Sequence, residues 1–284
     1  MIMVNYDYHY LEDISIPSPV VKKIVDVALV QSRLLIWKQY YPVAFSILEA
    51  NTTIDAIYYS NIIECSTNGT LASTVDKKRV EQLLKGDEPK NELETKMVSY
   101  HKAREYVHQT ARDHPLTPDY IKKVHKILTE DYHSLAGQLR HDNRPYKAYC
   151  TMAVIRKPMD YKLLEKNLQR FCEAAESSIQ SENIDRLLLM SYIISDFQIM
   201  SPFRCGNGRM YRLLFEYLLL RFDMDMIKYV SLDKEFFIDV RNHMESIYRS
   251  TDRKNGDYID YIPLIGNFMD CLWNAASRLD MMFP

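Results

Sequence analysis

The chain has 284 residues, with 36 Lys and Arg against 38 Asp and Glu, and this near balance disfavours a nucleic-acid-binding protein that relies on charge over its whole surface. Its 47% hydrophobic and 26% charged residues are typical of a soluble globular protein with a sizeable core, while no apolar run approaches the roughly 20 residues of a membrane span. Five scattered cysteines and the lack of a signal-peptide pattern favour a reducing, cytoplasmic location, so we expect neither a nucleic-acid nor a membrane partner.

Residues 1–115 are expected to form an N-terminal helical region. Apolar residues at helical spacing predict a helix over residues 21–37, carried by positions 21, 24, 25, 28, 29, 35 and 36. A second helix over 46–63 is expected to turn Ile47 and Ile57 inward and to end before the turn residues 66–70. Shorter helical patterns follow over 75–84 and 92–110.

The second half of the chain predicts more helices around one irregular stretch. Thr117 and Pro118 are typical of an N-cap and a first helical position, and predict a helix to about residue 131. Gly137, Pro145 and Pro158 break the stretch 137–160 into a loop or small hairpin. Helices are expected over residues 161–179, 184–200 and 208–222, and two or three more after residue 222, with an amphipathic end over 258–283. The helix over 184–200 is apolar almost all round and should be the buried centre of an all-α fold.

Two glycines stand out because the chain has only seven. Gly206 and Gly208 lie one residue apart, in a loop that leads into the predicted helix over 208–222. The N-terminus of a helix offers free N–H groups to an anion. Arg209 and Arg212 are three residues apart and share one face of that helix, so phosphate binding is one interpretation. The alternative is a tight helix-to-helix turn with two solvated arginines.

Residues 201–212 (SPFRCGNGRMYR) resemble the Fic signature HxFx(D/E)GNGRxxR. Phe203 matches, as does the run Gly206-Asn207-Gly208-Arg209, and Arg212 matches at its spacing. The resemblance extends to residues 117–125 and 137–140, to Tyr248 and to Gly256-Asp257. It implies a Fic-like helical bundle with a small β-hairpin flap, a core over residues 116–258 and a C-terminal helix over 259–284 that packs on it.

The resemblance also includes an inhibitory motif in the N-terminal region. Ser60 and Glu64 have the spacing of the motif (S/T)xxxE(G/N), although Cys65 follows where the motif has Gly or Asn. In the subclass with an N-terminal inhibitory helix, this glutamate pairs with the second motif arginine, here Arg212, and obstructs the γ-phosphate of ATP. A carboxylate at a phosphate site competes with the nucleotide for one guanidinium. The alternative is an ordinary surface acid at a helix end.

Two positions depart from the signature, and both carry chemistry in the family, which transfers AMP from ATP to protein hydroxyls. Ser201 replaces the histidine that acts as general base, a group that typically contributes about 10²–10⁴-fold to the rate. Cys205 replaces the acid that holds Mg²⁺, and a thiol is a poor ligand for this hard ion. Cys205 itself is either a reactive thiol beside arginines or simply a small residue that fits the turn.

The resemblance places residues 145–155 at the flap that holds a target protein segment, with Tyr146 and Tyr149 as contacts. We expect a Fic-type protein that binds ATP or another nucleotide, with Mg²⁺ disfavoured, and that is impaired in AMP transfer to an unidentified target protein. One alternative is an active transferase whose base is Ser201, Cys205 or a distant histidine (His133, His141 or His243). The other is a helical regulator or scaffold, homodimeric or bound to an antitoxin-like partner.

Overall fold

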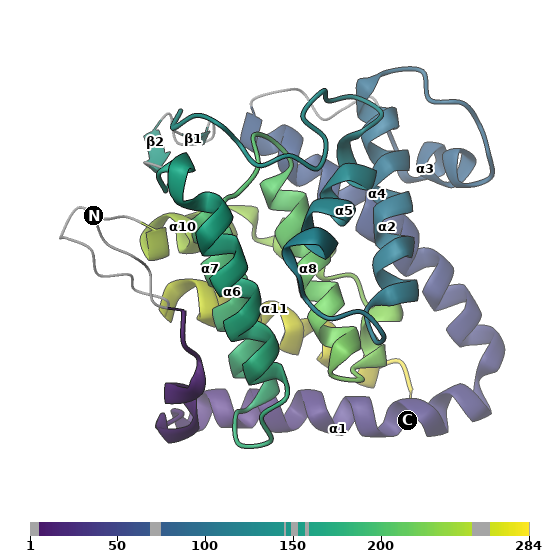
Figure 1. The fold of residues 1–284 in the computed structure, drawn as a ribbon. Helices are drawn as coiled ribbons and strands as arrows, with labels where there is room; N and C mark the ends of the chain where they lie inside the picture. The colour runs from purple at the N-terminus through teal and green to yellow at the C-terminus, as the bar shows by residue number, and fades with distance from the viewer. Residues whose placement is uncertain are drawn as a thin grey trace.

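The computed structural model describes residues 6–68, 75–144, 146–148, 153–156, 159–251 and 262–283. Within these ranges the chain is almost entirely helical, as the sequence predicts (Figure 1). The α-helices are α1 (Ser18–Tyr40), α2 (Pro42–Asn68), α3 (Lys77–Leu84), α4 (Glu92–Thr110), α5 (Pro118–Thr129), α6 (Leu164–Ile179), α7 (Arg186–Met200), α8 (Asn207–Arg221), α9 (Leu232–Ile238), α10 (Val240–Thr251) and α11 (Ile262–Asp280). Short 3₁₀ turns cover His9–Asp13, Tyr161–Leu163 and Asp225–Lys228.

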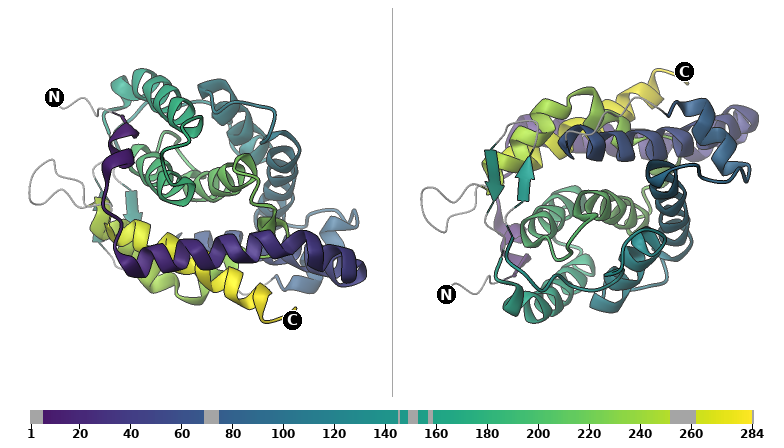
Figure 2. Two further views of the ribbon diagram at one scale, coloured as in Figure 1. Left: turned by 90° about the horizontal axis from the view of Figure 1, so that it is seen from below. Right: turned by 90° about the horizontal axis from the view of Figure 1, so that it is seen from above.

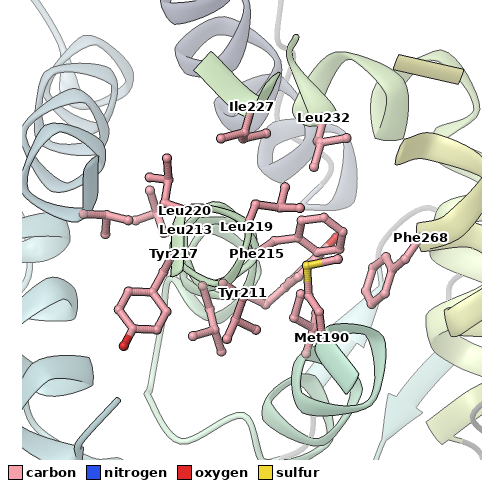
Figure 3. Close-up of a cluster of buried hydrophobic side chains, with 14 of the residues drawn as sticks. Met190, Tyr211, Leu213, Phe215, Tyr217, Leu219, Leu220, Ile227, Leu232 and Phe268 are labelled. Carbon is pink, nitrogen blue, oxygen red and sulfur yellow. The ribbon is translucent and has the colours of Figure 1, made fainter. Parts of the chain in front are cut away.

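Helix α8 is the centre of the fold. All of its residues from Arg209 to Leu220 are buried, and Figure 3 looks along it, with side chains pointing outward on every side. Met190 of α7 and Phe268 of α11 pack against it on one side, and Leu232 of α9 lies on another. A helix that is apolar around most of its circumference must be enclosed by others. The predicted central helix over 184–200 is its neighbour α7, which is also buried along most of its length.

Side-chain caps fix where several helices begin. The hydroxyl of Thr117 accepts a hydrogen bond from the backbone N–H of Tyr120 at 3.1 Å, and Pro118 occupies the first helical position, as predicted. The carboxylate of Asp185 accepts in the same way from the N–H of Leu188, at 2.8 Å. These caps satisfy N–H groups that would otherwise lack a partner at a helix start.

The first two helices differ from the prediction in detail. Helix α1 lies along one side of the molecule next to α11 (Figure 2), and buries Val27, Val30, Leu34 and Trp37. These are not the apolar positions that carried the prediction. Helix α2 begins four residues before Ser46 because Pro42 suits a first helical position. It continues through Asn68, so the predicted break at 66 is wrong, and Ile47 is exposed while Ile57 is buried.

Strands β1 (Tyr146–Ala148) and β2 (Ala153–Arg156) pair antiparallel, with Lys147 opposite Val154. They interrupt the helices between α5 and α6, within the stretch that the sequence marks as irregular. Residues 149–152 lie outside the described residues. No helix in the described part of the chain has both the length and the apolar character needed to cross a membrane.

Candidate functional site

The loop between α7 and α8 is shaped by two residues in the left-handed region. Ser201 ends α7 with φ 41°, and Gly206 precedes α8 with φ 71°. A Cβ added at Gly206 would meet only ordinary contacts, the nearest being Thr129 Cγ2 at 3.5 Å. The positive φ is therefore the reason for glycine at this position.

Asn207 and Phe203 close this loop on itself. The side-chain oxygen of Asn207 accepts a hydrogen bond from the N–H of Phe203 at 3.0 Å, and its amide nitrogen donates to the carbonyl of Phe203 at 2.7 Å. The Phe203 ring is fully buried. Its backbone forms a bridge with Leu139, which ties the loop to the segment after α5.

His125 of α5 supports the loop from below. Its ring stacks on Phe203 with centroids 3.7 Å apart. Its Nδ1 accepts from the N–H of Gly137 at 3.0 Å, so Nε2 carries the proton and donates to the carbonyl of Cys205 at 3.1 Å. Burial lowers the pKa of His125 to about 4. Both ring nitrogens are thus engaged, and the side chain holds the loop as a neutral ring.

Arg140 holds the opposite side of the loop. It is buried, and its Nε donates to the carbonyl of Ser201 at 3.0 Å. Its Nη1 donates to the carbonyl of Asp142 at 2.8 Å, and its Nη2 to that of Met159 at 2.5 Å. Its backbone N–H donates to the carbonyl of Pro202 at 2.9 Å. The role of Arg140 was not predicted, because its partners are backbone atoms distant in the sequence.

Arg209 lies in the first turn of α8, next to the helix N-terminus. It is buried, and its guanidinium lies over the ring of Tyr132, 5.5 Å from the ring centre. Within the described ranges, its Nε and Nη1 atoms have no hydrogen-bond partner. Buried donors without partners are rare in folded proteins and carry a free-energy cost. This arginine therefore offers two free donors beside a positive helix end.

Arg212, one turn further along α8, is surrounded by acceptors. Its Nε donates to the hydroxyl of Ser60 at 2.9 Å, and its Nη2 to the carbonyl of Ser60 at 2.9 Å. Nη2 also lies 3.2 Å from the Glu64 carboxylate, and Nε lies 3.0 Å from that of Asp233. The two residues predicted from the inhibitory motif, Ser60 and Glu64, thus both contact the arginine predicted to bind phosphate.

Because Gly208 has no side chain, the carboxylate of Glu64 has room to lie against it. A Cβ built at Gly208 would clash with Oε1 of Glu64. Since the φ of Gly208 is not in the left-handed region, backbone conformation does not require glycine there. The two glycines of the loop therefore have different functions: Gly206 allows the turn, and Gly208 admits a carboxylate to the first turn of α8.

The sequence did not predict that a second acid, Asp233, contacts Arg212 on its buried side. Asp233 is in the first turn of α9, and the hydroxyl of Tyr100 lies 3.4 Å from its carboxylate. Burial raises the pKa of Asp233 to about 6, although the charge of Arg212 opposes the rise. An acid in the first turn is a common helix-start signal, so nothing local marks Asp233 as a partner of Arg212.

A known protein family matches the segment that contains this loop. Residues 115–219 match the model of the Fic/DOC family. This segment is therefore similar to the Fic/DOC family. No curated protein sequence matches the chain.

Solved Fic structures share the fold well beyond that segment. A Fic family protein from Desulfovibrio desulfuricans G20 superposes with a TM-score of 0.71 at 14% identity, over 95% of this chain and 76% of its own. A Fic domain containing signaling protein from Bacteroides thetaiotaomicron gives 0.64 at 16% identity, over 92% and 95%. Fic-1 from C. elegans gives 0.63 at 12% identity, over 93% and 73%.

At the two positions that depart from the Fic signature, the Ser201 hydroxyl is hydrogen-bonded and the Cys205 thiol is neutral. The Ser201 hydroxyl donates to the carbonyl of Gln198 at 2.7 Å. Burial raises the pKa of the Cys205 thiol, although the charge of Arg209 opposes this. The raised pKa disfavours the reactive-thiolate interpretation of Cys205, since a protonated thiol is a weak nucleophile.

The three histidines considered as substitute bases differ in their surroundings. His243 is buried between the hydroxyl of Tyr211 and Oδ1 of Asn267, and burial lowers its pKa to about 4. His133 uses its Nδ1 to accept from the N–H of Leu135 at 3.1 Å, and His141 is exposed. Tyr149 and Gly256-Asp257 lie outside the described residues, while Tyr146 belongs to β1 and Tyr248 to α10.

The residues at the loop do not fit Mg²⁺. Cys205 stands at the metal-ligand position of the signature, and burial keeps its sulfur protonated and soft, whereas Mg²⁺ prefers charged oxygen ligands. The described residues contain no group of three His, Cys, Asp or Glu side chains able to hold a metal ion. We therefore assign no step to a metal bound by this loop.

Proposed function

We propose that this protein binds a nucleotide by its phosphates at the N-terminus of α8, that Glu64 inhibits this binding, and that the site is impaired in AMP transfer. The observation that carries the proposal is the contact between Glu64 and Arg212, 3.2 Å apart across Gly208. A carboxylate held there occupies the place of an anion at a positively charged site.

The unpartnered nitrogens of Arg209 support an anionic ligand. A buried guanidinium with two free donors is costly in the empty protein, and a phosphate oxygen would satisfy it. The loop is held rigid by Asn207, His125 and Arg140, so the donors are positioned before the ligand arrives. Preorganisation of this kind raises affinity, because less freedom is lost on binding.

The side chains at positions 201 and 205 support impaired transfer. A serine hydroxyl cannot take a proton from a target hydroxyl at neutral pH, and the histidine that contacts the loop, His125, has both ring nitrogens occupied. Loss of a positioned base typically lowers the rate by about 10²–10⁴-fold. The donors that bind phosphate remain, while the group that would accept the proton is gone.

The test compares the natural chain with Glu64→Ala and with Glu49→Ala, an exposed acid on the same helix that serves as control. We expect calorimetry to detect ATP binding by Glu64→Ala that is at least about tenfold tighter than that of the natural chain or of Glu49→Ala. The affinity should depend little on Mg²⁺. If Glu64→Ala binds no ATP, ADP or AMP, nucleotide binding is refuted.

Intact-mass spectrometry of Glu64→Ala after incubation with ATP and Mg²⁺ tests the second half of the proposal. An unchanged mass is expected. Addition of one AMP moiety would show that transfer survives without the motif histidine, and the active-transferase alternative would replace ours. The experiment includes a mixture of candidate protein substrates, so that loss of self-modification is not mistaken for loss of transfer.

A further inference from the structure

Helix α1 has an apolar face that points away from the protein. The side chains of Val21, Val25, Leu29, Leu35, Ile36 and Tyr40 are between 41% and 77% exposed. The start of α2 adds two more exposed apolar side chains, Val43 and Ile47. We call these eight residues the α1 outer face. Figure 2 shows α1 across the front of the molecule seen from below, with its outer side uncovered by other helices.

This face is distinct from the one that holds α1 to the core. Val27, Val30, Leu34 and Trp37 are buried on the opposite side of the helix, towards α11. A helix at the surface normally presents charged and polar residues to water. Among the exposed positions of α1, only Lys22 and Arg33 are charged.

The area is large for a single exposed patch. From their exposed fractions, the eight residues of the α1 outer face offer roughly 900 Å² of accessible surface, against about 300–600 Å² for the largest apolar patch of a typical monomer. A standard protein–protein interface buries about 800 Å² on each partner. The α1 outer face is therefore large enough to form a stable interface by itself.

We propose that a second copy of this chain covers the α1 outer face, with the two α1 helices antiparallel around Ser32. Residues 21, 25, 28, 32, 35 and 39 alternate in steps of four and three, the spacing at which two helices pack side by side along a straight seam. Counting outward from Ser32, Leu29 of one copy meets Leu35 of the other. In the same way Ala28 meets Ile36, and Val25 meets Gln39.

The pairing is self-complementary in size. Small side chains at Ala28 and Ser32 lie near the centre, where the helices approach most closely, and larger ones lie on both sides. Such a two-fold contact uses the same patch on both subunits and closes after two copies. The inference is independent of the proposed function, because none of these residues contacts the loop between α7 and α8.

The charges on α1 disfavour a membrane as the occupant. An interfacial helix attracted to anionic lipid carries free Lys and Arg along its polar side. Here Lys23 pairs with Asp270 and Arg33 with Asp280, both on α11. Two of the four basic residues of the helix are thus paired with acids of its own protein.

Sedimentation velocity of the full chain over a range of concentrations tests the proposal. We expect a dimer at micromolar concentration. Ile36→Glu should raise the dissociation constant at least about 100-fold, because it buries a carboxylate without a partner. Ile238→Glu is the matched control, since Ile238 is exposed to the same degree, 56% against 57%, but lies on α9. Circular dichroism checks that both variants are folded.

A charge swap tests the pairing itself. Leu29→Glu alone and Leu35→Lys alone should each weaken the dimer, whereas the two together should restore it, since each Glu then faces a Lys of the other copy. A chain that stays monomeric at its solubility limit overturns the proposal. So does a dimer that Ile36→Glu leaves intact, or a monomer that sediments with anionic vesicles. If the double variant stays monomeric although the natural chain dimerises, the antiparallel pairing is overturned.

Discussion

The carboxylate of Glu64 lies against Gly208, in the space that any other residue would fill with its Cβ. From there it reaches Nη2 of Arg212 at 3.2 Å. Glu64 and Gly208 thus fit each other, although 143 positions of the chain separate them and only one of them belongs to the signature loop.

Gly208→Ala tests this fit. The added methyl group must push the carboxylate aside, which weakens its contact with Arg212. In the natural chain we expect the gain in helix propensity, about 0.5–1 kcal/mol, to be cancelled by the lost contact. In a Glu64→Ala background the same change should stabilise the protein by about that amount. Urea unfolding of the four chains measures the coupling, and a coupling energy near zero would contradict the fit.

His125 should make stability depend on pH. Burial lowers its pKa to about 4 in the folded protein, whereas an unfolded histidine titrates near 6.5. As the pH falls below 6.5, the unfolded chain takes up the proton first, so the folded state loses stability until about pH 4. The expected loss is about 2 kcal/mol between pH 7 and pH 5.

The variant His125→Gln should lack this part of the pH dependence, even if it is less stable overall. His141→Gln, which changes an exposed histidine, should keep the natural slope. Urea unfolding at both pH values measures the difference. Equal slopes for all three chains would show that His125 is not the group that titrates.

Arg209→Met should stabilise the protein while abolishing nucleotide binding. The methionine fills a similar space without burying two unpartnered donors, and we expect a gain of about 1–2 kcal/mol in the free energy of unfolding. Thermal unfolding and ATP calorimetry, both in the Glu64→Ala background, test the two effects. Destabilisation would mean that Arg209 serves the fold rather than a ligand.

Restoring the signature residues at both departing positions tests whether the rest of the site can support AMP transfer. In the Glu64→Ala background, Ser201→His together with Cys205→Asp should give AMP transfer at least about 10²-fold faster than Glu64→Ala alone, since a base is regained. Either change alone should give less. If the double change yields no product with ATP and Mg²⁺ although ATP still binds, parts of the site other than these two positions have also lost the function.

The sequence predicts the helices well because their caps and apolar periods are local. Thr117 and Pro118 specify the start of α5 without any knowledge of its neighbours. Helix α1 shows the limit of this reasoning. It is apolar on two sides, so periodicity predicts a helix correctly but cannot decide which side is buried. Its partner α11 comes more than 200 residues later.

The contacts of the candidate site also divide into those that local motifs predict and those that they do not. The pairing of Glu64 with Arg212 could be expected from a motif, because both ends of the contact lie in recognisable patterns. Asp233 and Arg140 could not, since each acts on atoms far away in the sequence. The role of His125 was hidden for another reason: its ring serves backbone atoms at Gly137 and Cys205, and no spacing rule identifies such contacts.

The contacts of the loop separate two kinds of signature residue. Phe203, Gly206 and Asn207 would be needed to fold this turn even in a protein that never met a nucleotide, because their partners are inside the loop and its supports. Gly208 and Arg209 do nothing comparable for the turn. In a related domain that no longer binds any ligand, we expect the residues equivalent to Phe203, Gly206 and Asn207 to be retained and those equivalent to Gly208 and Arg209 to be replaced. The residues at positions 208 and 209 would therefore show whether such a domain still binds a ligand.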